Sequence, residues 1–378
     1  MKTAVCDLLG VEFPILAFSH CRDVVAEVSK AGGFGVLGAV GHTPDQLDVD
    51  LGWIEDEVGA APFGVDLIVP AKYAGDDQGG LTMDALKAMI PGGHQDFLAE
   101  LLDRYAVPPL PEGGHGSSYA ESMDDAPFSA KRADLQMDVA FGHRISLIAN
   151  ALGPPPATMI ERAHGHGVKV AALAGSRVHA ERHVNAGVDL IVAQGYEAGG
   201  HTGEIGSMVL IPEIVDAASS VPVLGAGGIG RGRQMAEAMA LGAEGVWCGS
   251  VWLTTEEAET EPVVKAKMLE ATSSDTERSR SLTGKPARML RSAWTTEWNR
   301  EDTPEPLGMP LQPVLAAQAQ ARIRRAAANH DGAAELSNYF VGQIVGTMNQ
   351  PKSARAVVYD FIEEFITSVE GLARHLEM

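Results

Sequence analysis

The stretch VDLIVAQGYEAGGHTGEIGSM, residues 188–208, joins a short apolar run to a loop that holds five glycines and one histidine, His201. The run is short and rich in β-branched residues, as in a parallel strand that is buried on both faces. Two similar units follow it, VPVLGAGGIGRG (221–232) and GVWCGS (245–250). Three consecutive strands that end in glycine indicate a parallel sheet whose carboxyl ends form one binding face.

The same alternation of apolar runs and helical patterns extends back toward the start of the chain. We predict eight strands, near residues 13–18, 34–38, 63–69, 145–151, 168–173, 189–193, 222–225 and 244–249. Eight strand–helix units in about 250 residues are typical of an α/β fold of the (β/α)8 TIM barrel type. An open doubly wound sheet is the alternative. It would carry G-x-G-x-x-G after the first strand, where this chain has AFSHC (17–21).

Two segments fall outside this alternation. Residues 70–140 are too long for one loop, so we expect an insertion after the third strand that forms a lid or additional helices. Beyond residue 255 the chain is charged and then helical, with apolar positions at helical spacing near the end. We expect a barrel over residues 1–255, including the insertion, and a helical extension over residues 256–378. The extension would pack on the barrel or on a partner subunit, and a homodimer is the expected assembly.

Composition excludes several classes of partner. The chain has 378 residues, is 45% hydrophobic and carries a formal net charge of -21, which would repel nucleic acids and anionic membrane surfaces. It has no apolar run of the roughly 18 residues that a membrane span requires, and Glu12 and Pro14 interrupt the amino-terminal apolar residues. We expect a cytoplasmic protein. The three cysteines have no C-x-x-C spacing, and we expect no metal site.

The loops after the seventh and eighth strands are the expected position of a phosphate site. GAGGIGRG (225–232) lies at the start of a helix, and CGS (248–250) ends the eighth strand. In a barrel of this type these loops and a helix N-terminus recurrently bind phosphate groups. At any one loop the glycines could serve only the turn. Three adjacent loops favour a phosphorylated ligand.

His201 is the candidate catalytic residue because an imidazole near neutrality can give and take a proton. Glu197 in the same loop could orient it or pair with a barrel neighbour. His20, after the first strand, could also face the ligand. Short polar side chains lie at the ends of strands 1, 4 and 5, namely Ser19, Asn150 and Ser176. Other histidines are expected at the surface, on the opposite rim or in the insertion: His94, His115, His164 and His166.

The motifs AQGYEAGGHTGEIG (193–206), VPVLGAGGIGRG and GVWCGS resemble those of the nitronate monooxygenase superfamily, and the flavin-dependent enoyl-acyl-carrier-protein reductases share them. The resemblance extends over most of the chain apart from the insertion and the C-terminal helices. The segments that extend it are VEFPI (11–15), VSKAGGFGVLG (28–38), FGVDLIVP (63–70) and SLTGKPARMLR (281–291).

The resemblance implies a barrel that holds FMN non-covalently, with His201 as the active-site histidine. The residues expected to hold the phosphate are Gly227, Gly228, Gly249 and Ser250. Those expected to contact the ribityl chain and ring are Gln194, Gly199 and Gly200. The further cofactor contacts expected at the strand ends are Ala17, Phe18, Ser19, Asn150 and Ala226.

Two departures bear on the activity. Nitronate monooxygenases of the superfamily usually carry Q-A-P-M at the end of the first strand, where this chain has LAFSHCRD (16–23). They usually place a histidine at the end of the fourth strand, where this chain has Asn150. The first-strand segment and the long insertion resemble instead an actinobacterial subgroup of NAD(P)H-dependent flavin oxidoreductases. That subgroup acts on coenzyme A thioesters in the breakdown of the last steroid rings.

The resemblance thus implies a reductase that uses NAD(P)H as co-substrate and reduces a conjugated C=C bond of a small acyl-CoA-type molecule, with steroid-derived thioesters among the candidates. An acidic protein needs local cations for such a ligand. The cations considered are Lys131, Arg132, Arg144, Lys285, Arg288 and Arg291, most of which would otherwise be solvated. The candidate substrate contacts are His20, Arg144 and Lys285. The alternative activity is that of a nitronate monooxygenase, with His201 as base and oxygen as electron acceptor.

Overall fold

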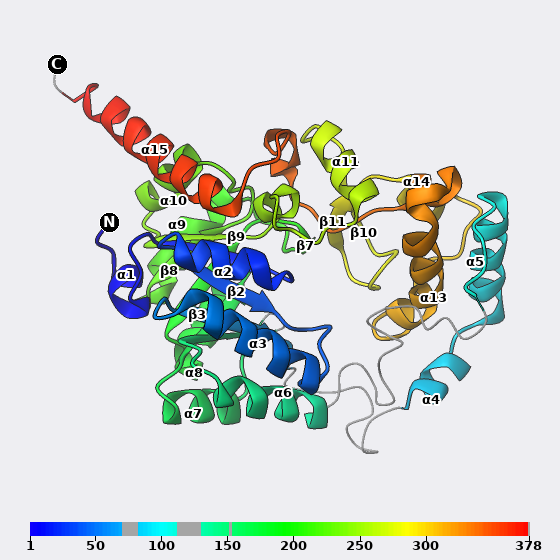
Figure 1. The fold of residues 1–378 in the computed structure, drawn as a ribbon, viewed down its shortest axis with the longest axis horizontal. Helices are drawn as coiled ribbons and strands as arrows, with labels where there is room; N and C mark the ends of the chain where they lie inside the picture. Colours follow the sequence, from blue (N-terminus) through cyan, green and yellow to red (C-terminus); the bar gives the residue numbers. More distant parts are fainter. Residues whose placement is uncertain (70–81, 112–129, 151–152, 377–378) are drawn as a thin grey trace.

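Eight parallel strands form a closed barrel in the computed structural model, which describes residues 1–69, 82–111, 130–150 and 153–376 (Figure 1). The strand order is β1-β2-β3-β4-β5-β6-β8-β9, and β1 pairs with β9 to close the barrel. The predicted (β/α)8 barrel is confirmed, and every predicted strand overlaps an observed one. The strands are β1 (Ile15–Ser19), β2 (Phe34–Gly38), β3 (Phe63–Leu67), β4 (Leu147–Asn150), β5 (Lys169–Ala174), β6 (Leu190–Gln194), β8 (Val223–Ala226) and β9 (Gly245–Cys248).

Side chains alternate between the two sides of the barrel wall, as the two-residue period of a strand requires. Leu16, Phe34 and Val192 belong to the interior cluster, and α1 (Ala4–Leu9) packs against that cluster through Val5 and Leu9. The other side of each strand packs against an outer layer of helices (Figure 1). These are α2 (Arg22–Lys30), α3 (Pro44–Val58), α6 (Ala130–Gly142), α7 (Ala157–Gly165), α8 (Arg177–Ala186), α9 (Ser207–Ala218) and α10 (Gly232–Ala240).

A second lobe lies beside the barrel and has its own hydrophobic core (Figure 1). Its core joins Leu101 from the insertion to Trp294 and Trp298 from the C-terminal third of the chain. The helices of this lobe are α4 (Met83–Ala88), α5 (Gly92–Arg104), α12 (Ala293–Trp298), α13 (Leu311–Ala326) and α14 (Asp331–Leu336). The expected division at residue 255 is therefore corrected, because α4 and α5 pack with the C-terminal helices and not with the barrel.

A three-stranded antiparallel sheet lies outside the barrel and follows the order β10-β11-β7. Its strands are β10 (Thr276–Ser279), β11 (Ala287–Leu290) and β7 (Gly200–His201), and α11 (Pro262–Glu270) precedes β10. Because β7 belongs to the loop after β6, this sheet connects the C-terminal third of the chain to the carboxyl end of the barrel.

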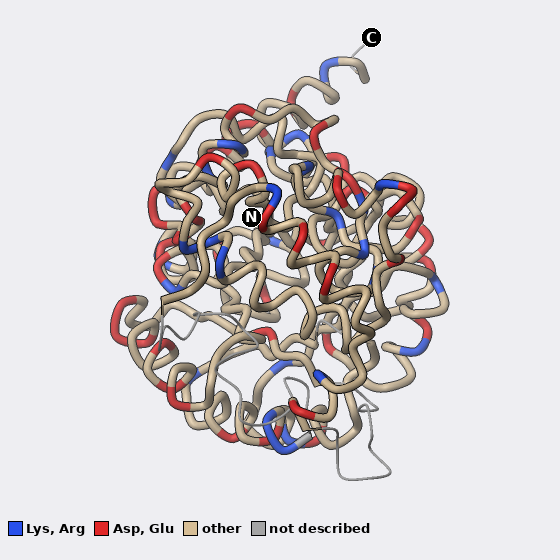
Figure 2. Tube along the Cα trace, turned by 90° about the vertical axis from the view of Figure 1, so that its right-hand side faces the viewer, with Lys and Arg blue, Asp and Glu red and all other residues tan. Residues whose placement is uncertain are grey.

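The last helix, α15 (Ala354–Ala373), packs on α10 and α2 through Val357, Val358 and Phe361. Among the described residues no helix is long and apolar enough to cross a membrane. Figure 2 shows Asp and Glu spread over many of the outer helices, in keeping with the net charge of -21.

The contact between α10 and α15 gives a test of the fold. A Cβ atom on Gly232 would overlap the carbonyl oxygen of Phe361 and the amide nitrogen of Phe365. Since a packed helix pair cannot absorb this overlap without moving, we expect Gly232→Ala to lower the free energy of unfolding by about 1–3 kcal/mol in urea denaturation. Gly165→Ala is the matched control, because a Cβ there meets nothing within 4 Å. Equal stability of the two variants would contradict the observed packing of α15.

Candidate active site at the carboxyl end of the barrel

His201 lies on a paired strand. Gly200 pairs with Arg288 and His201 pairs with Ala287, both on β11. Backbone pairing with a distant segment therefore fixes these two residues of the glycine-rich loop. The segment responsible belongs to SLTGKPARMLR (281–291), which thereby acquires a structural role at the site.

Two arginines hold the loop from the face of Gly200, opposite to the side chain of His201. Arg278 and Arg288 face each other across β10 and β11, and their guanidinium carbons lie 5.0 and 4.5 Å from the ring centre of Tyr196. Arg288 donates to the carbonyl oxygen of Tyr196 through Nε at 3.2 Å and Nη2 at 3.1 Å. The aromatic ring and the carbonyls compensate the repulsion between facing like charges. Arg288 is 3% exposed, so its interpretation as a solvated or CoA-binding cation is corrected.

The ring of His201 has three neighbours that bear on its chemistry. Its Nε2 lies 2.8 Å from Oγ1 of Thr283, and its ring centre lies 6.5 Å from that of Phe340. Burial in the barrel mouth, followed by the charge of Lys285, lowers the pKa of His201 to about 4. The residue is still exposed to solvent on one side, so a substrate can reach it. At neutral pH the imidazole is uncharged and acts as a hydrogen-bonding group more than as a proton source.

Residues 339–343, which we call the crossing segment, pass over the ends of the barrel loops. The amide of Gly342 donates to Oγ of Ser250 at 2.8 Å, and the amide of Gln343 donates to the carbonyl oxygen of Glu197 at 2.9 Å. A Cβ atom on Gly199 would overlap Gly342. Gly199 therefore lacks a side chain because the crossing segment packs on it, and its backbone contact with the ribityl chain stays a prediction. Sequence analysis missed this segment because it carries no motif.

Two glycines after β8 turn the chain beside the N-terminus of α10. Gly227 and Gly228 have φ angles of 93° and 71°, in the left-handed region that favours glycine. Within the described residues, the amides of Gly227, Gly228 and Gly249 donate to no protein acceptor. Unpaired backbone donors at adjacent strand ends, next to a helix N-terminus, are a suitable site for a phosphate group. These donors fit the phosphate of FMN.

Aromatic rings line the barrel beside these loops. The ring of Phe18 stacks with Trp247 at 6.3 Å between centres and meets His20 edge-on at 5.1 Å. Nδ1 of His20 lies 2.7 Å from the carbonyl oxygen of Gly38, so this nitrogen carries the proton and Nε2 is left as an acceptor. Burial lowers the pKa of His20. The side chain of Ala17 faces the helices and is fully buried, so only its backbone can contact a ligand, and the expectation is corrected to that extent.

Other expected contacts do lie at this end of the barrel. Gln194 and Ala226 are register partners at the ends of β6 and β8. Gly200 has open space around the position of a Cβ atom. Oγ of Ser19 accepts from the amide of Cys21 at 3.1 Å. Lys285 is exposed in the turn before β11, close enough to affect His201, and forms no ion pair with any described residue.

Two expected contacts are excluded by their positions. Arg144 precedes β4 at the amino-terminal end of the barrel, where it bonds to the side chain of Glu55 and the carbonyl of Gly59. It therefore cannot contact a substrate at the carboxyl end. Asn150 is completely buried, and its amide bonds to the backbone of Val69 at 3.0 and 3.2 Å and of Gly153 at 3.3 Å. Its side chain is a link between two loops and is not available to a cofactor.

Ser176, His94, His164 and His166 have local partners. Ser176 caps α8, and His164 bonds to Asp189 at 2.8 Å on the rim opposite to the site, as expected. His94 bonds to the carbonyl of Glu305 at the second lobe. His115 lies outside the described residues.

Asp66 on β3 is a buried acid that sequence analysis missed. Its flanking residues Val65 and Leu67 face the helices, so Asp66 points into the barrel, where it is 3% exposed. No described residue hydrogen-bonds to its carboxyl group. Burial raises the pKa of Asp66 to about 7. One aspartate in the otherwise apolar strand FGVDLIV was the pattern that could have revealed it.

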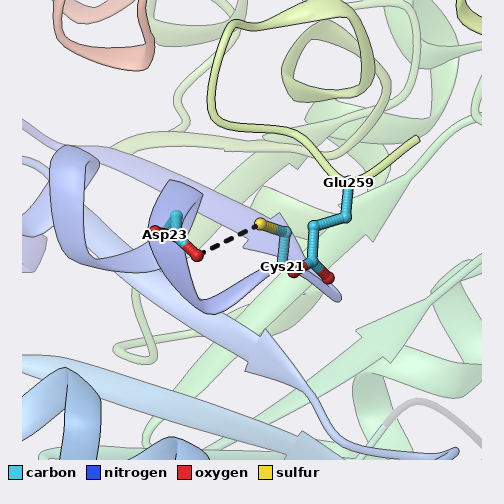
Figure 3. A group of neighbouring side chains, drawn as sticks. All are labelled: Cys21, Asp23 and Glu259. Atoms are coloured by element: carbon cyan, nitrogen blue, oxygen red, sulfur yellow. Dashed lines mark hydrogen bonds between the residues drawn. The ribbon is translucent and has the colours of Figure 1, made fainter. Parts of the chain in front are cut away.

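One cluster has the composition of metal ligands. Cys21, Asp23 and Glu259 bring three potential ligand atoms within 4.8 Å of one another (Figure 3). Sγ of Cys21 instead donates to the carbonyl oxygen of Glu257 at 3.1 Å, and burial raises the pKa of the thiol, which keeps it protonated. We assign no metal to this cluster. The three cysteines of the chain are all buried and free.

Comparison with known families decides the class of this site. The family described as nitronate monooxygenase matches residues 2–364. The chain belongs to the nitronate monooxygenase family. It is a flavin-dependent oxidoreductase, and the enzymes of this family use FMN. The unpaired amides after β8 and β9 agree with that cofactor.

Relatives within the family cover almost the whole chain. The protein Rv1533 of Mycobacterium tuberculosis, named as a candidate monooxygenase, is 61% identical over 98% of both chains. A protein of Staphylococcus saprophyticus named as a probable nitronate monooxygenase is 29% identical over 96% of this chain and 98% of its own length.

Solved structures of similar proteins agree in fold. FabK from Thermotoga maritima has a TM-score of 0.72 and 26% identity, with 99% of each chain covered. A nitroalkane oxidase from Streptomyces ansochromogenes has a TM-score of 0.79 and 24% identity, with 98% of this chain and 100% of its own chain covered. The second likeness shows the fold alone.

The buried carboxyl group of Asp66 predicts a pH dependence of stability. In the unfolded chain this group ionises above its ordinary pKa of 3.8, whereas in the barrel it stays protonated up to about pH 7. The folded protein therefore loses stability as the pH rises through this interval. Asp66→Asn removes the effect, so at pH 8 the variant should exceed the parent by as much as about 4 kcal/mol, with little difference near pH 4.

Urea denaturation of both proteins at several pH values measures this difference. Asp216→Asn, on the outer helix α9, is the control for loss of one negative charge from an acidic protein. A constant difference between Asp66→Asn and the parent across the pH range would show that the carboxyl group is not held neutral.

Proposed function

We propose that this enzyme is an FMN-dependent reductase that takes electrons from NAD(P)H and reduces a conjugated C=C bond of an acyl-CoA-type substrate. The observation that carries the proposal is Lys285, a cation without an ion-pair partner among the described residues, beside an uncharged histidine at the barrel mouth. In a chain with a net charge of -21, such a cation favours a ligand that carries phosphate groups. Bound FMN would supply the hydride chemistry between the nicotinamide and the C=C bond.

The source of the proton limits the role of His201 to orienting the substrate or the path of the proton. Reduction consumes NAD(P)H and one proton, with hydride added to one carbon of the double bond and the proton to the other. A pKa of about 4 leaves few protonated His201 side chains at neutral pH, so the proton comes from water and His201 orients its path or the substrate. Lys285 would bind an anionic part of the substrate or of the nicotinamide.

Asn150 supports reduction over nitronate oxidation. It occupies the last position of β4, where the resemblance led us to expect a histidine, and its amide is bonded to backbone groups. An asparagine does not titrate, so Asn150 adds no second acid–base group at the end of β4. The motifs shared with flavin-dependent enoyl reductases, and the likeness to FabK, support the same choice.

Nitronate oxidation is the second candidate. Relatives at 28–29% identity are named as probable nitronate monooxygenases. In this reaction the uncharged His201 would act as the base, and oxygen would accept the electrons. The two candidates differ in whether NAD(P)H or the organic substrate donates electrons.

The expected homodimer stays a prediction. Ile366, Val369 and Leu372 lie on the outer half of α15 and are 44–61% exposed. A second copy of the chain would remove these apolar side chains from water.

Anaerobic stopped-flow spectroscopy separates the two candidates. We expect NADH or NADPH to bleach the flavin absorbance, and an enoyl-CoA such as crotonyl-CoA to restore it. The proposal would be contradicted if neither NADH nor NADPH bleaches the flavin but propyl nitronate reduces it. Oxygen would then be consumed when air is admitted.

Variants then test the role of His201. We expect His201→Asn to lower turnover at least tenfold, since the substitution removes the ring that orients the substrate or the path of the proton. His164→Asn, on the opposite rim, should stay within about twofold of the parent. Because His201 titrates near pH 4, turnover between pH 5 and 8 should show no ionisation assigned to it.

Cofactor binding has an independent test at Gly249. Of the residues that the structure describes, a Cβ atom there would meet Phe18 alone, at an ordinary contact distance of 3.7 Å, so this part of the chain tolerates alanine. If the phosphate lies against this backbone, the added methyl group should weaken FMN binding at least tenfold in a fluorescence titration, with unchanged stability of the apoprotein. Gly165→Ala is the control. Unchanged FMN affinity of Gly249→Ala would remove Gly249 from the phosphate site.

A further inference from the structure

Thr283 contacts the ring of His201 and a backbone carbonyl at the same time. It lies in the turn between β10 and β11, and its Oγ1 is 2.8 Å from Nε2 of His201. The same oxygen is 3.1 Å from the carbonyl oxygen of Lys285 and 3.4 Å from the amide nitrogen of Lys285. These contacts determine which way the hydrogen bonds run.

A hydroxyl group has one proton to donate, and a carbonyl oxygen can only accept. The proton of Thr283 therefore goes to the carbonyl of Lys285, and its oxygen accepts from the histidine. Nε2 of His201 must then carry the proton, which leaves Nδ1 as the unprotonated nitrogen. The amide of Lys285 also donates toward Oγ1 and supports the same direction.

We propose that Thr283 is a positioning residue that fixes His201 in the Nε2–H form and leaves Nδ1 as its hydrogen-bond acceptor. In its effect on turnover, this inference rests on the proposed function. The expected proton position of His201 does not depend on the proposed function.

The contact adds something that the strand pairing cannot supply. Pairing between β7 and β11 fixes the backbone of His201, but the ring can still rotate and a neutral imidazole has two proton positions. Thr283 restrains both. His20 provides a contrast in the same mouth, because its Nδ1 donates to Gly38 and its Nε2 is the acceptor. The two histidines therefore present opposite nitrogens.

Nitrogen NMR of the folded protein tests the proton position directly. With 15N-labelled histidine, the His201 signals are identified by their loss in His201→Asn. At pH 7 we expect an unprotonated Nδ1 and a protonated Nε2. A protonated Nδ1 in the parent protein would overturn the proposal whatever the variants show.

Substitutions at Thr283 test whether its hydroxyl group causes this proton position of His201. Thr283→Val keeps the shape but removes the hydroxyl, so we expect a mixture of the two proton positions, whereas Thr283→Ser should restore the parent pattern. Thr367→Val, on exposed α15, is the matched control. An unchanged proton position in Thr283→Val would overturn the proposal. If the valine variant fails to fold, the parent and the serine variant still give a decision, because both must show the Nε2–H form.

Turnover provides the functional measurement. We expect Thr283→Val to lower kcat about tenfold with FMN affinity unchanged, and Thr283→Ser to stay within about twofold. An equal loss in the valine and serine variants would indicate a structural role and contradict the proposal. If the parent shows the expected proton position but NAD(P)H does not bleach its flavin, the proposed function fails and the role of Thr283 stands.

Discussion

The pairing of β7 with β11 is the constraint on which the site depends. Parallel barrel strands end in loops, and a loop with five glycines has no conformation of its own. Two residue pairs, Gly200 with Arg288 and His201 with Ala287, attach this loop to a separate sheet. Arg288 adds hydrogen bonds to Tyr196 from the opposite face. The glycines allow the close approach of backbone, and the distant strand removes the freedom that glycine brings.

Burial keeps the titratable groups of the barrel uncharged. It lowers the pKa of His201, at the barrel mouth, to about 4 and raises that of Asp66, inside the barrel, to about 7, so both resist ionisation. The charge of Lys285, at the exposed rim, lowers the pKa of His201 further. An electrostatic arrangement of this kind attracts anions to the rim, where the uncharged His201 acts through hydrogen bonds.

Local sequence patterns were sufficient to predict the strands of the barrel. They were insufficient to predict the contacts that fix the loops after those strands. Each strand is a short apolar run, so residues 190–194 or 223–226 could be predicted from their own composition. The position of His201 depends on residues 283–290, and nothing near His201 indicates that partner. Asn150 was assigned to the cofactor because of its position at a strand end, whereas its amide is used by Val69. Arg144 precedes β4 and therefore lies at the amino-terminal end of the barrel, so its prediction as a substrate contact at the carboxyl end was wrong. Periodicity predicts elements, but pairings between distant segments need the folded chain.

The second lobe has a consequence for the order in which this protein can fold. Its core joins Leu101 to Trp294 and Leu336, so an early helix has its partners near the end of the chain. On the ribosome α5 emerges long before those partners exist, and its apolar face stays uncovered while the remaining barrel strands are made. A chain that stops short of α12 could close its barrel, but it would leave that face exposed to chaperones and to other nascent chains.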